Sequence, residues 1–367
     1  MPLQIKHLVG LDSRFEHVKS LTDIDSVDDV CMLGIYGGGG IGKTTFAWEI
    51  YNKIRLQFEA ASFLHKVREK SNESSRGLEG LQRTLLSEMG VETQTMMGST
   101  FRGSSEIKRK LARKRVLLIL DDVDSVKQLE SLAGGHDWFG SGSIVIVTTR
   151  DIDVLHKHDV KIKTEEPNHH ESTELFCWYA FNMSTHVENF EKVSSHAISY
   201  AKGIPLALKV IGSNLKGKSI EEWEIELQRY KKVPDAEIQS VLEISYKGLT
   251  DLDKKVFLDI ACFFKGESWD YVERILDACD FFPVIRIFVS KCLLTVDEKG
   301  CLEMHDLIQG MGREIVRKES ASNPGERSRL WSHKDVLDVL KENLVRIVSF
   351  FILFIRYLLF LKFGKYI

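Results

Sequence analysis

The chain has 367 residues, of which 43% are hydrophobic and 28% charged, and its formal net charge at pH 7 is −3. This length allows two or three domains with cores of their own, and the composition is that of a soluble globular chain. Because a surface that tracks nucleic-acid phosphates usually carries a clear positive excess, we expect no nucleic-acid partner.

The cysteines indicate a reducing environment. Six of them are scattered without C-x-x-C spacing, and most lie in apolar runs, where thiols behave as small core residues. The first six residues lack the apolar core of a secretory signal and are not an Arg-rich, Ser-rich transit peptide. We therefore expect a cytoplasmic protein.

A glycine-rich stretch, Gly37 to Thr45, follows the apolar run 30–36 and precedes apolar residues at helical spacing from Phe46 to Phe58. The stretch fits the phosphate-loop pattern G-x-x-x-x-G-K-[ST], which requires a strand before it and a helix after it. Backbone N–H groups of such a loop surround a polyphosphate, and the positive N-terminus of the helix points at the same anion. The stretch therefore predicts a nucleotide phosphate site.

Three side chains of this loop have separate expected roles. Lys43 is expected to place a charge between the β- and γ-phosphates, Thr44 to offer a hydroxyl ligand to Mg²⁺, and Thr45 to lie near the α-phosphate. A glycine-rich turn without a ligand is the alternative, but the strand and helix on either side argue against it. The backbone cradle consists of Gly37, Gly38, Gly39, Gly40, Ile41 and Gly42.

Strands and helices alternate through this first part of the chain. Ala60–Leu64 is the second expected strand, and residues 78–89 form an amphipathic helix. A polar, flexible stretch at 69–76 precedes this helix, and a weakly patterned loop at 92–105 follows it. The alternation predicts a parallel sheet with flanking helices.

The apolar strand at 116–120 ends in Asp121 and Asp122. A parallel strand buried on both faces is apolar throughout, and the carboxyl end of an open α/β sheet is where ligands bind. We expect Asp121 to hold Mg²⁺ through water, and Asp122 to orient or deprotonate an attacking water. The alternative is an acid pair that only starts a turn or caps a helix.

A further apolar strand at 144–147 ends in Thr148, Thr149 and Arg150. An arginine at the carboxyl end of a strand beside the acidic one can reach a γ-phosphate and report its presence. A surface salt bridge is the alternative for this residue.

From about residue 166 the pattern changes to helices. Periodic apolar residues between 172 and 215 predict a small helical bundle. Pro205 starts the third helix rigidly, because proline fixes φ and lacks an N–H. Its ring could also pack against an aromatic base.

A third region begins near residue 238. Helices, one of them capped by Asp251, precede a β-hairpin at 293–304, a combination typical of a winged-helix module. His305 follows the hairpin, and a lone histidine at such a junction favours a structural role.

The chain ends in apolar residues 347–361, interrupted by Arg356 and followed by Lys362 and Lys365. About fifteen helical residues span roughly 22 Å, which is short of the ~30 Å hydrocarbon layer of a bilayer. The pattern favours a replaced or read-through tail of a truncated product over a marginal membrane segment, although membrane contact through the tail stays open.

Five of these motifs, in this order, resemble the NB-ARC nucleotide-binding domain of plant disease-resistance proteins. Asp122 and residues 257–264 resemble the subclass with an N-terminal TIR domain and C-terminal leucine-rich repeats, and we expect this chain to lack both. Gly38 stands where the family often has methionine. This change is tolerable because the backbone of the loop, rather than this side chain, binds the phosphates. The motifs are the phosphate loop, 117–122, 148–150, Gly203–Leu206 and Met304–Asp306.

The resemblance implies an ADP/ATP-operated switch of plant innate immunity, ADP-bound when closed and signalling-competent after exchange for ATP. It places Val9 and Gly10 beside the adenine and Pro205 on the nucleotide. Arg150 would sense the γ-phosphate, and His305 would contact the β-phosphate of ADP. Lys43, Thr44 and Thr45 would bind phosphates, while Asp121 and Asp122 would serve Mg²⁺ and hydrolysis.

The implied partners are an adenine nucleotide and either a second copy of this chain, through self-association, or a full-length resistance protein. Two alternatives from other classes stay open. One is a general P-loop ATPase with rapid turnover, whereas the switch would be at most a slow ATPase. The other is a truncated, non-enzymatic adaptor or decoy.

The expected architecture has four parts. The first is an α/β P-loop NTPase domain with a parallel sheet and flanking helices, followed by a helical bundle and a winged-helix domain that resemble the ARC1 and ARC2 subdomains. A hydrophobic tail ends the chain. The expected bounds are 1–165, 166–235, 236–340 and 341–367.

Overall fold

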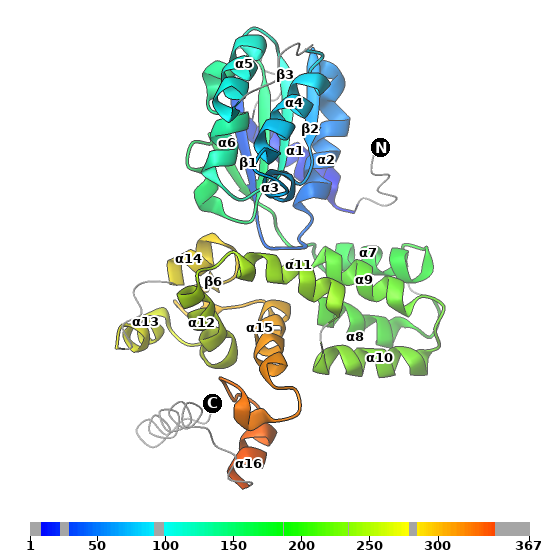
Figure 1. Ribbon diagram of the computed structural model, residues 1–367. Coiled ribbons are helices and arrows are strands. Elements are labelled where there is room, and N and C mark those ends of the chain that lie inside the picture. The colour runs from blue at the N-terminus through cyan, green and yellow to red at the C-terminus, as the bar shows by residue number, and fades with distance from the viewer. Residues whose placement is uncertain are drawn as a thin grey trace. The chain divides into compact units, whose positions relative to one another are not determined.

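The computed structural model describes residues 9–22, 29–91, 99–185, 187–233, 235–278 and 285–341 (Figure 1). The chain forms two compact units. The first unit runs to Ile220 and includes Ser290–Cys292, and the second contains Glu221–Val289 and the residues from Leu293 onward. The expected boundaries at 165/166, 235/236 and 340/341 stay predictions, and the apolar tail at 347–361 lies outside the described residues.

A parallel sheet forms the centre of the first unit and, within the described ranges, has five strands in the order β2-β3-β4-β1-β5. The four strands expected from the sequence are confirmed. The edge strand β5 was not anticipated, because its alternating valine, isoleucine and lysine residues are too few to stand out. The strands are β1 (Cys31–Tyr36), β2 (Ala60–Leu64), β3 (Val116–Val123), β4 (Ile144–Thr149) and β5 (Val160–Lys163).

Helices cover both faces of this sheet, which explains why β3 is apolar from Val116 to Leu120. Leu117 and Ile119 belong to the core cluster that includes α1 and α2, whereas Leu118 belongs to the cluster with α4, α5 and α6. Figure 1 shows the strands between these two groups of helices. The helices are α1 (Leu11–Thr22), α2 (Lys43–Ile54), α4 (Gly77–Glu88), α5 (Thr100–Leu111) and α6 (Val126–Leu132).

Two loops expected in this unit are partly helical, so those predictions were wrong. Helix α3 (Val67–Asn72) occupies the first half of the stretch expected to be flexible, because Val67 is fully buried and anchors it. Helix α5 begins inside the loop expected at 92–105, with the Ser99 side chain accepting a hydrogen bond from Arg102 N. Residues 92–98 lie outside the described residues.

The helical region after the sheet is confirmed. A capping box starts α7, in which Asn168 and Glu171 each accept from the other's backbone N–H at 2.9 Å. Pro205 occupies the first turn of α9, as predicted. The helices are α7 (His169–Phe181), α8 (Glu191–Ala201), α9 (Pro205–Leu215) and, from the boundary between the units, α10 (Ile220–Lys232).

The second unit has helices and a short antiparallel hairpin, as expected for a winged-helix module. Asp251 does not cap α12; Thr250 does, because its hydroxyl reaches Asp253 N at 3.2 Å, and Asp251 is the first helical residue. The elements are α11 (Ala236–Lys247), α12 (Asp251–Asp259), the π-helix η4 (Ile260–Phe264), α13 (Trp269–Asp277), α14 (Ile285–Ser290), β6 (Thr295–Val296), β7 (Leu302–Glu303), α15 (Asp306–Glu319) and α16 (His333–Lys341).

Single-turn helices connect several of these elements. They are the 3-10 helices η1 (Arg55–Gln57), η2 (His136–Trp138), η3 (Ile152–Leu155) and η5 (Pro324–Glu326). Within the described ranges, no helix combines the length and the apolar character that a bilayer crossing requires.

Candidate functional site

The phosphate loop joins β1 to α2 in a conformation that depends on glycine. Gly40 and Gly42 have φ of 77° and 97°, in the left-handed region that other residues avoid. Gly42 occupies the N-cap position of α2, and no side chain caps this helix. The first-turn N–H groups of α2 are therefore left for a ligand, as in an anion-binding loop.

Lys43 lies inside this loop, with 7% of its surface exposed. Its Nζ donates to the carbonyl oxygens of Gly37 and Gly38, both at 2.8 Å. Burial, and then the positive charge of Arg150, lower the pKa of Lys43 to about 7, although nearby aspartates oppose this change. The ammonium group is thus short of negative charge, which a bound phosphate would supply.

The start of α9 packs directly against the loop. Leu206 N donates to the carbonyl oxygen of Gly40 at 3.2 Å. A Cβ added to Gly40 would lie 3.0 Å from Leu206 Cβ, and one added to Gly42 would lie 3.9 Å from Pro205 Cγ. The structure therefore brings Pro205 beside the phosphate loop, although its contact with a nucleotide stays a prediction.

Asp121 lies at the carboxyl end of β3 and is 1% exposed. Its Oδ1 accepts from Thr44 Oγ1 at 2.7 Å and from Thr148 Oγ1 at 2.8 Å, and His65 Nδ1 lies 2.7 Å from its Oδ2. Burial alone raises the pKa of Asp121, but the interactions with His65, Thr44 and Thr148 together outweigh burial and bring the pKa below its ordinary value. The carboxylate is therefore ionised at neutral pH.

Asp122 interrupts the regular pairing of β3. Its φ is 59°, and the register between β3 and β4 shifts between Leu120 and Val123. Its backbone N–H donates to Thr148 Oγ1 at 2.8 Å. The Thr148 hydroxyl thus contacts both aspartates, and it secures a backbone conformation that is uncommon for a non-glycine residue.

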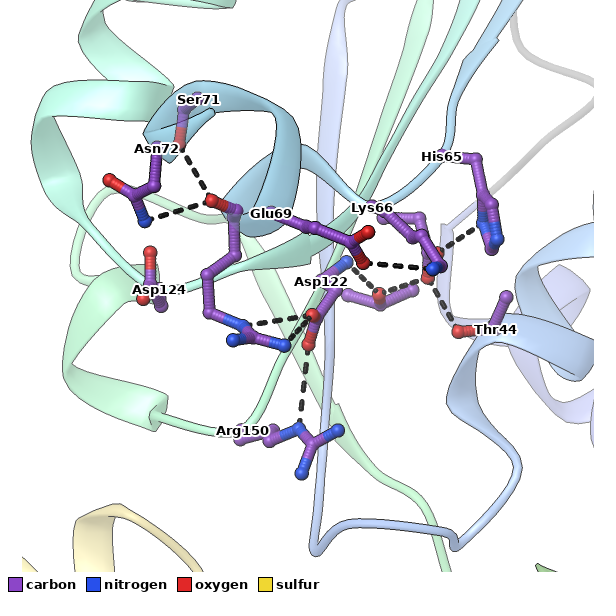
Figure 2. Close-up of polar contacts among 12 residues, drawn as sticks. Thr44, His65, Lys66, Glu69, Ser71, Asn72, Asp122, Asp124 and Arg150 are labelled. Carbon is purple, nitrogen blue, oxygen red and sulfur yellow. Dashed lines mark hydrogen bonds and ion pairs between the residues drawn. The ribbon is translucent and has the colours of Figure 1, made fainter. Parts of the chain in front are cut away.

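The Asp122 carboxylate is shared between two arginines. Arg68 Nε and Nη2 lie 2.9 and 2.8 Å from Oδ2, and Arg150 Nε lies 3.4 Å from Oδ1. Figure 2 shows Asp122 between Arg150 and the α3 segment that carries Ser71 and Asn72. Burial lowers the pKa of Arg150 and the Asp122 charge opposes this, but an arginine with so high a pKa stays charged. Arg150 thus makes an ion pair inside the site rather than on the surface.

Sequence reasoning missed His65, Arg68 and Thr148. His65 directly follows β2, and α3 then carries Arg68 to the same edge of the sheet. The available signal was the position after β2, since the carboxyl ends of neighbouring parallel strands share one edge. Thr148 was noticed only as part of a motif, and its two hydrogen bonds depend on how β3 and β4 pair.

Val9 and Gly10 lie at the start of α1. The φ of Gly10 is 67°, which favours glycine, and a Cβ added there would lie 1.9 Å from Glu171 Oε1, so the Glu171 side chain would have to move. Arg14 also contacts Glu171, at 3.5 Å between Nη2 and Oε2. Gly10 is thus placed against α7, and the expected proximity of Val9 and Gly10 to adenine stays a prediction.

His305 belongs to the second unit and caps a helix. Its Nδ1 accepts from Leu307 N at 3.1 Å at the start of α15. The structural role that the sequence favoured is therefore present. The contact with the β-phosphate of ADP that the family resemblance implies stays a prediction.

Most of the expected site residues of the first unit meet at one edge of its sheet. The loop from Gly37 to Thr45 contacts Asp121 through Thr44 and lies beside Pro205, and Asp122 contacts Arg150. The catalytic, metal-binding and nucleotide-binding roles of these residues stay predictions.

Two regions of the chain match known domain families. Residues 14–186 match the NB-ARC domain, and residues 250–320 match the winged-helix domain described as "Disease resistance protein Roq1-like". Disease resistance protein RUN1 of Vitis rotundifolia is 45% identical over 334 residues, which are 90% of this chain and 25% of that protein. TMV resistance protein N of Nicotiana glutinosa is 39% identical over 348 residues, 92% of this chain and 30% of that protein. The chain thus spans less than a third of either relative.

A solved structure has a similar fold. The ORC2 protein of Aeropyrum pernix, determined in ADPNP–ADP complexes, has a TM-score of 0.50 and 12% sequence identity, and the match covers 86% of this chain and 96% of that one. At this identity the likeness concerns the fold alone.

The two hydrogen bonds of the buried Thr148 hydroxyl yield a test of the site's rigidity. Thr148→Val keeps the shape of the side chain but leaves Asp122 N–H without this acceptor, so we expect the free energy of unfolding to fall by about 1–3 kcal/mol. Thr84→Val is the matched control, because the Thr84 hydroxyl is exposed and bonds only within its own helix. Urea unfolding followed by circular dichroism measures both; equal, small changes would contradict this account of Asp122.

Proposed function

Because the chain contains an NB-ARC domain and a Roq1-like winged-helix domain, we propose that it is a nucleotide-operated switch in plant immune signalling. In this proposal ADP holds the closed state, and exchange for ATP produces the signalling-competent state. The observation that carries the proposal is the buried Lys43, held by two carbonyl groups inside a loop whose helix has no side-chain cap.

The loop suits the phosphates of a nucleotide in three ways. No side chain caps the N–H groups at the start of α2, and the helix dipole adds a partial positive charge there. Lys43 supplies a full charge, which its contacts with Gly37 and Gly38 hold in place. A diphosphate would therefore give the ammonium group anionic acceptors in addition to the two neutral carbonyl oxygens.

Thr44 and Asp121 are suited to Mg²⁺. Their side-chain oxygens lie 2.7 Å apart, and a hydroxyl and an ionised carboxylate are hard oxygen ligands of the kind that Mg²⁺ prefers. We propose that Thr44 ligates the ion directly and that Asp121 holds it through water. A bound Mg²⁺ would neutralise phosphate charge, and Thr148 would keep the Asp121 carboxylate oriented toward it.

Arg150 gives the site a means to distinguish the two nucleotides. One anionic partner of Arg150 in the site is Asp122, whose Oδ1 lies 3.4 Å from Arg150 Nε. A γ-phosphate would compete for this guanidinium, so ATP and ADP would favour different arrangements of one side chain. Such differential affinity is what shifts a conformational equilibrium.

We propose that His305 and Pro205 act on the ADP side of the switch. A histidine of the winged-helix domain that reaches the β-phosphate contacts the terminal group of ADP, and this contact would stabilise the closed state. Pro205 would close over the nucleotide from the start of α9, which already bonds to the loop through Leu206. Val9 and Gly10 would then flank the adenine.

The same proposal includes a cytoplasmic location and protein partners for the switch. Burial, above all, raises the pKa of Cys31 to about 11 and of Cys262 to about 12, so both are protonated thiols, which suit the reducing cytoplasm. As protein partners we propose a second copy of this chain or a full-length resistance protein. The 45% identity with RUN1 means that such a protein carries a closely similar domain.

Titration calorimetry with ADP tests the proposed function directly. We expect nucleotide-free protein to bind ADP, and Lys43→Met to weaken binding about tenfold to hundredfold, because a charge-assisted contact of roughly 1.5–3 kcal/mol is lost. Lys53→Met is the matched control, since Lys53 lies on the same helix and pairs with Asp12 and Glu49 instead. Absence of ADP and ATP binding by the wild-type protein would contradict the switch.

The lowered pKa of Lys43 predicts that binding takes up protons. With a pKa of about 7 the side chain is mostly neutral at pH 8, and a bound diphosphate favours the charged form and raises the pKa again. We expect uptake of up to about one proton per ADP at pH 8, and little uptake well below pH 7, where Lys43 is already charged. Binding enthalpies in buffers of different ionisation enthalpy measure it.

The control for this prediction is Lys43→Arg, which keeps the charge but cannot lose its proton in this pH range. Any proton exchange that belongs to the nucleotide itself persists in this variant and is subtracted. Equal uptake by the wild type and Lys43→Arg would show that Lys43 is not the group that titrates.

His305 has a cap role and a proposed ligand role, which two substitutions separate. His305→Asn keeps a side-chain acceptor for the N–H groups of α15, whereas His305→Ala removes it. We expect both variants to bind ADP more weakly while ATP binding changes little, and only His305→Ala to lose about 1 kcal/mol of stability. Equal losses of affinity for ADP and ATP in His305→Asn would refute the ADP-specific contact.

A further inference from the structure

The Asp122 carboxylate has a second cationic partner that the proposed switch does not use. Arg150 is accounted for as the sensor of the γ-phosphate, but the closer contacts come from Arg68, at 2.9 and 2.8 Å to Oδ2. Arg68 is 25% exposed and Asp122 18%, so this ion pair is partly shielded from water. Such a pair is stronger than an ordinary surface salt bridge.

Main-chain contacts hold Arg68 in place independently of its side chain. Its carbonyl oxygen accepts from Ser71 Oγ at 3.0 Å and from Asn72 Nδ2 at 2.9 Å. Gln128 Nε2 donates to Ser71 Oγ at 2.8 Å, which ties α3 to α6. The fully buried Val67 anchors the same helix. The guanidinium of Arg68 is therefore directed to Asp122 from a fixed base.

Asp122 in turn does not need Arg68 to keep its backbone in place. Its N–H bonds to Thr148 Oγ1 at 2.8 Å, and this contact fixes the left-handed conformation. The action of Arg68 is thus confined to the carboxylate group. This separates a positioning role of Arg68 from a role in folding.

A carboxylate that serves as a general base must offer an oxygen to the attacking water within hydrogen-bond reach. Arg68 occupies Oδ2 with two N–H groups, and Arg150 lies beside Oδ1. If Arg150 leaves for a γ-phosphate, Arg68 still holds the carboxylate. The water must then compete with a guanidinium for Asp122.

We propose that Arg68 restrains ATP hydrolysis by keeping the Asp122 carboxylate engaged. This inference rests on the proposed function, since it concerns the same nucleotide site. In the restrained step, water attacks the γ-phosphorus and an oxygen–phosphorus bond forms. The bond from phosphorus to the β–γ bridging oxygen breaks, one water proton passes to Asp122, and ADP and inorganic phosphate are the products. Slow hydrolysis would prolong the ATP-bound state of the switch.

Single-turnover hydrolysis of labelled ATP by the full chain tests this role. We expect Arg68→Ala to raise the rate about tenfold, a fraction of the 10²–10⁴-fold that a positioned base contributes. Arg68→Gln, which keeps a polar side chain, is a second variant with the same expected rise. Arg68→Lys keeps a cation beside Asp122, so its rate should lie nearer to that of the wild type than to that of Arg68→Ala.

Two further variants separate this effect from a general loss of structure. Asp122→Asn in the Arg68→Ala background should abolish the gain, because the amide cannot accept the proton. Lys70→Ala is the matched control, since Lys70 is an exposed cation on the same helix and takes no part in the ion pairs to Asp122. Its hydrolysis rate should equal that of the wild type.

Affinities for ADP and ATP, measured on the same preparations, separate the two proposals. If both nucleotides bind but Arg68→Ala and Arg68→Gln hydrolyse ATP no faster than the wild type, the restraint is overturned and the switch stands. A gain that persists in the double variant with Asp122→Asn also overturns it. If the wild type binds neither nucleotide, the switch and the restraint fail together.

Discussion

The hydrogen bonds accepted by Asp121 are the contacts on which the site depends. One carboxylate oxygen joins Thr44 at the start of α2 and Thr148 at the end of β4, while the residue itself ends the apolar part of β3. Three elements that are distant in sequence are thereby fixed at one edge of the sheet. The left-handed glycines shape the phosphate loop, and the helix that follows it is bonded through Thr44 to the end of β3, two strands away from β1.

The distribution of charge at this edge follows from the same arrangement. Three cationic side chains, Lys43, Arg68 and Arg150, lie close to the two carboxylates Asp121 and Asp122. Burial first, and then the charge of Arg150, lower the pKa of Lys43. An anionic ligand with a bound divalent cation would stabilise the charged form of Lys43, which links the electrostatics of the site to the proposed nucleotide.

Local patterns were sufficient to predict much of this structure. The phosphate loop, the acidic strand end and Arg150 each lie within a few residues of a buried strand, so periodicity and motif spacing located them. The contacts of His65, Arg68 and Thr148 depend on which strands are neighbours, and β5 carries too few apolar residues to be noticed. Helix α3 was missed because it has no apolar stripe. The buried Val67 and the hydrogen bond between Ser71 and Gln128 hold it in place instead.

The central claim is that this chain holds ADP in its phosphate loop as the closed state of a switch. Denaturing the purified protein and identifying the released nucleotide by chromatography tests it most directly. The account predicts stoichiometric ADP from the wild type and much less from a variant in which Lys43 has lost its charge. Wild-type protein that releases no nucleotide, and cannot be loaded with ADP afterwards, would contradict it.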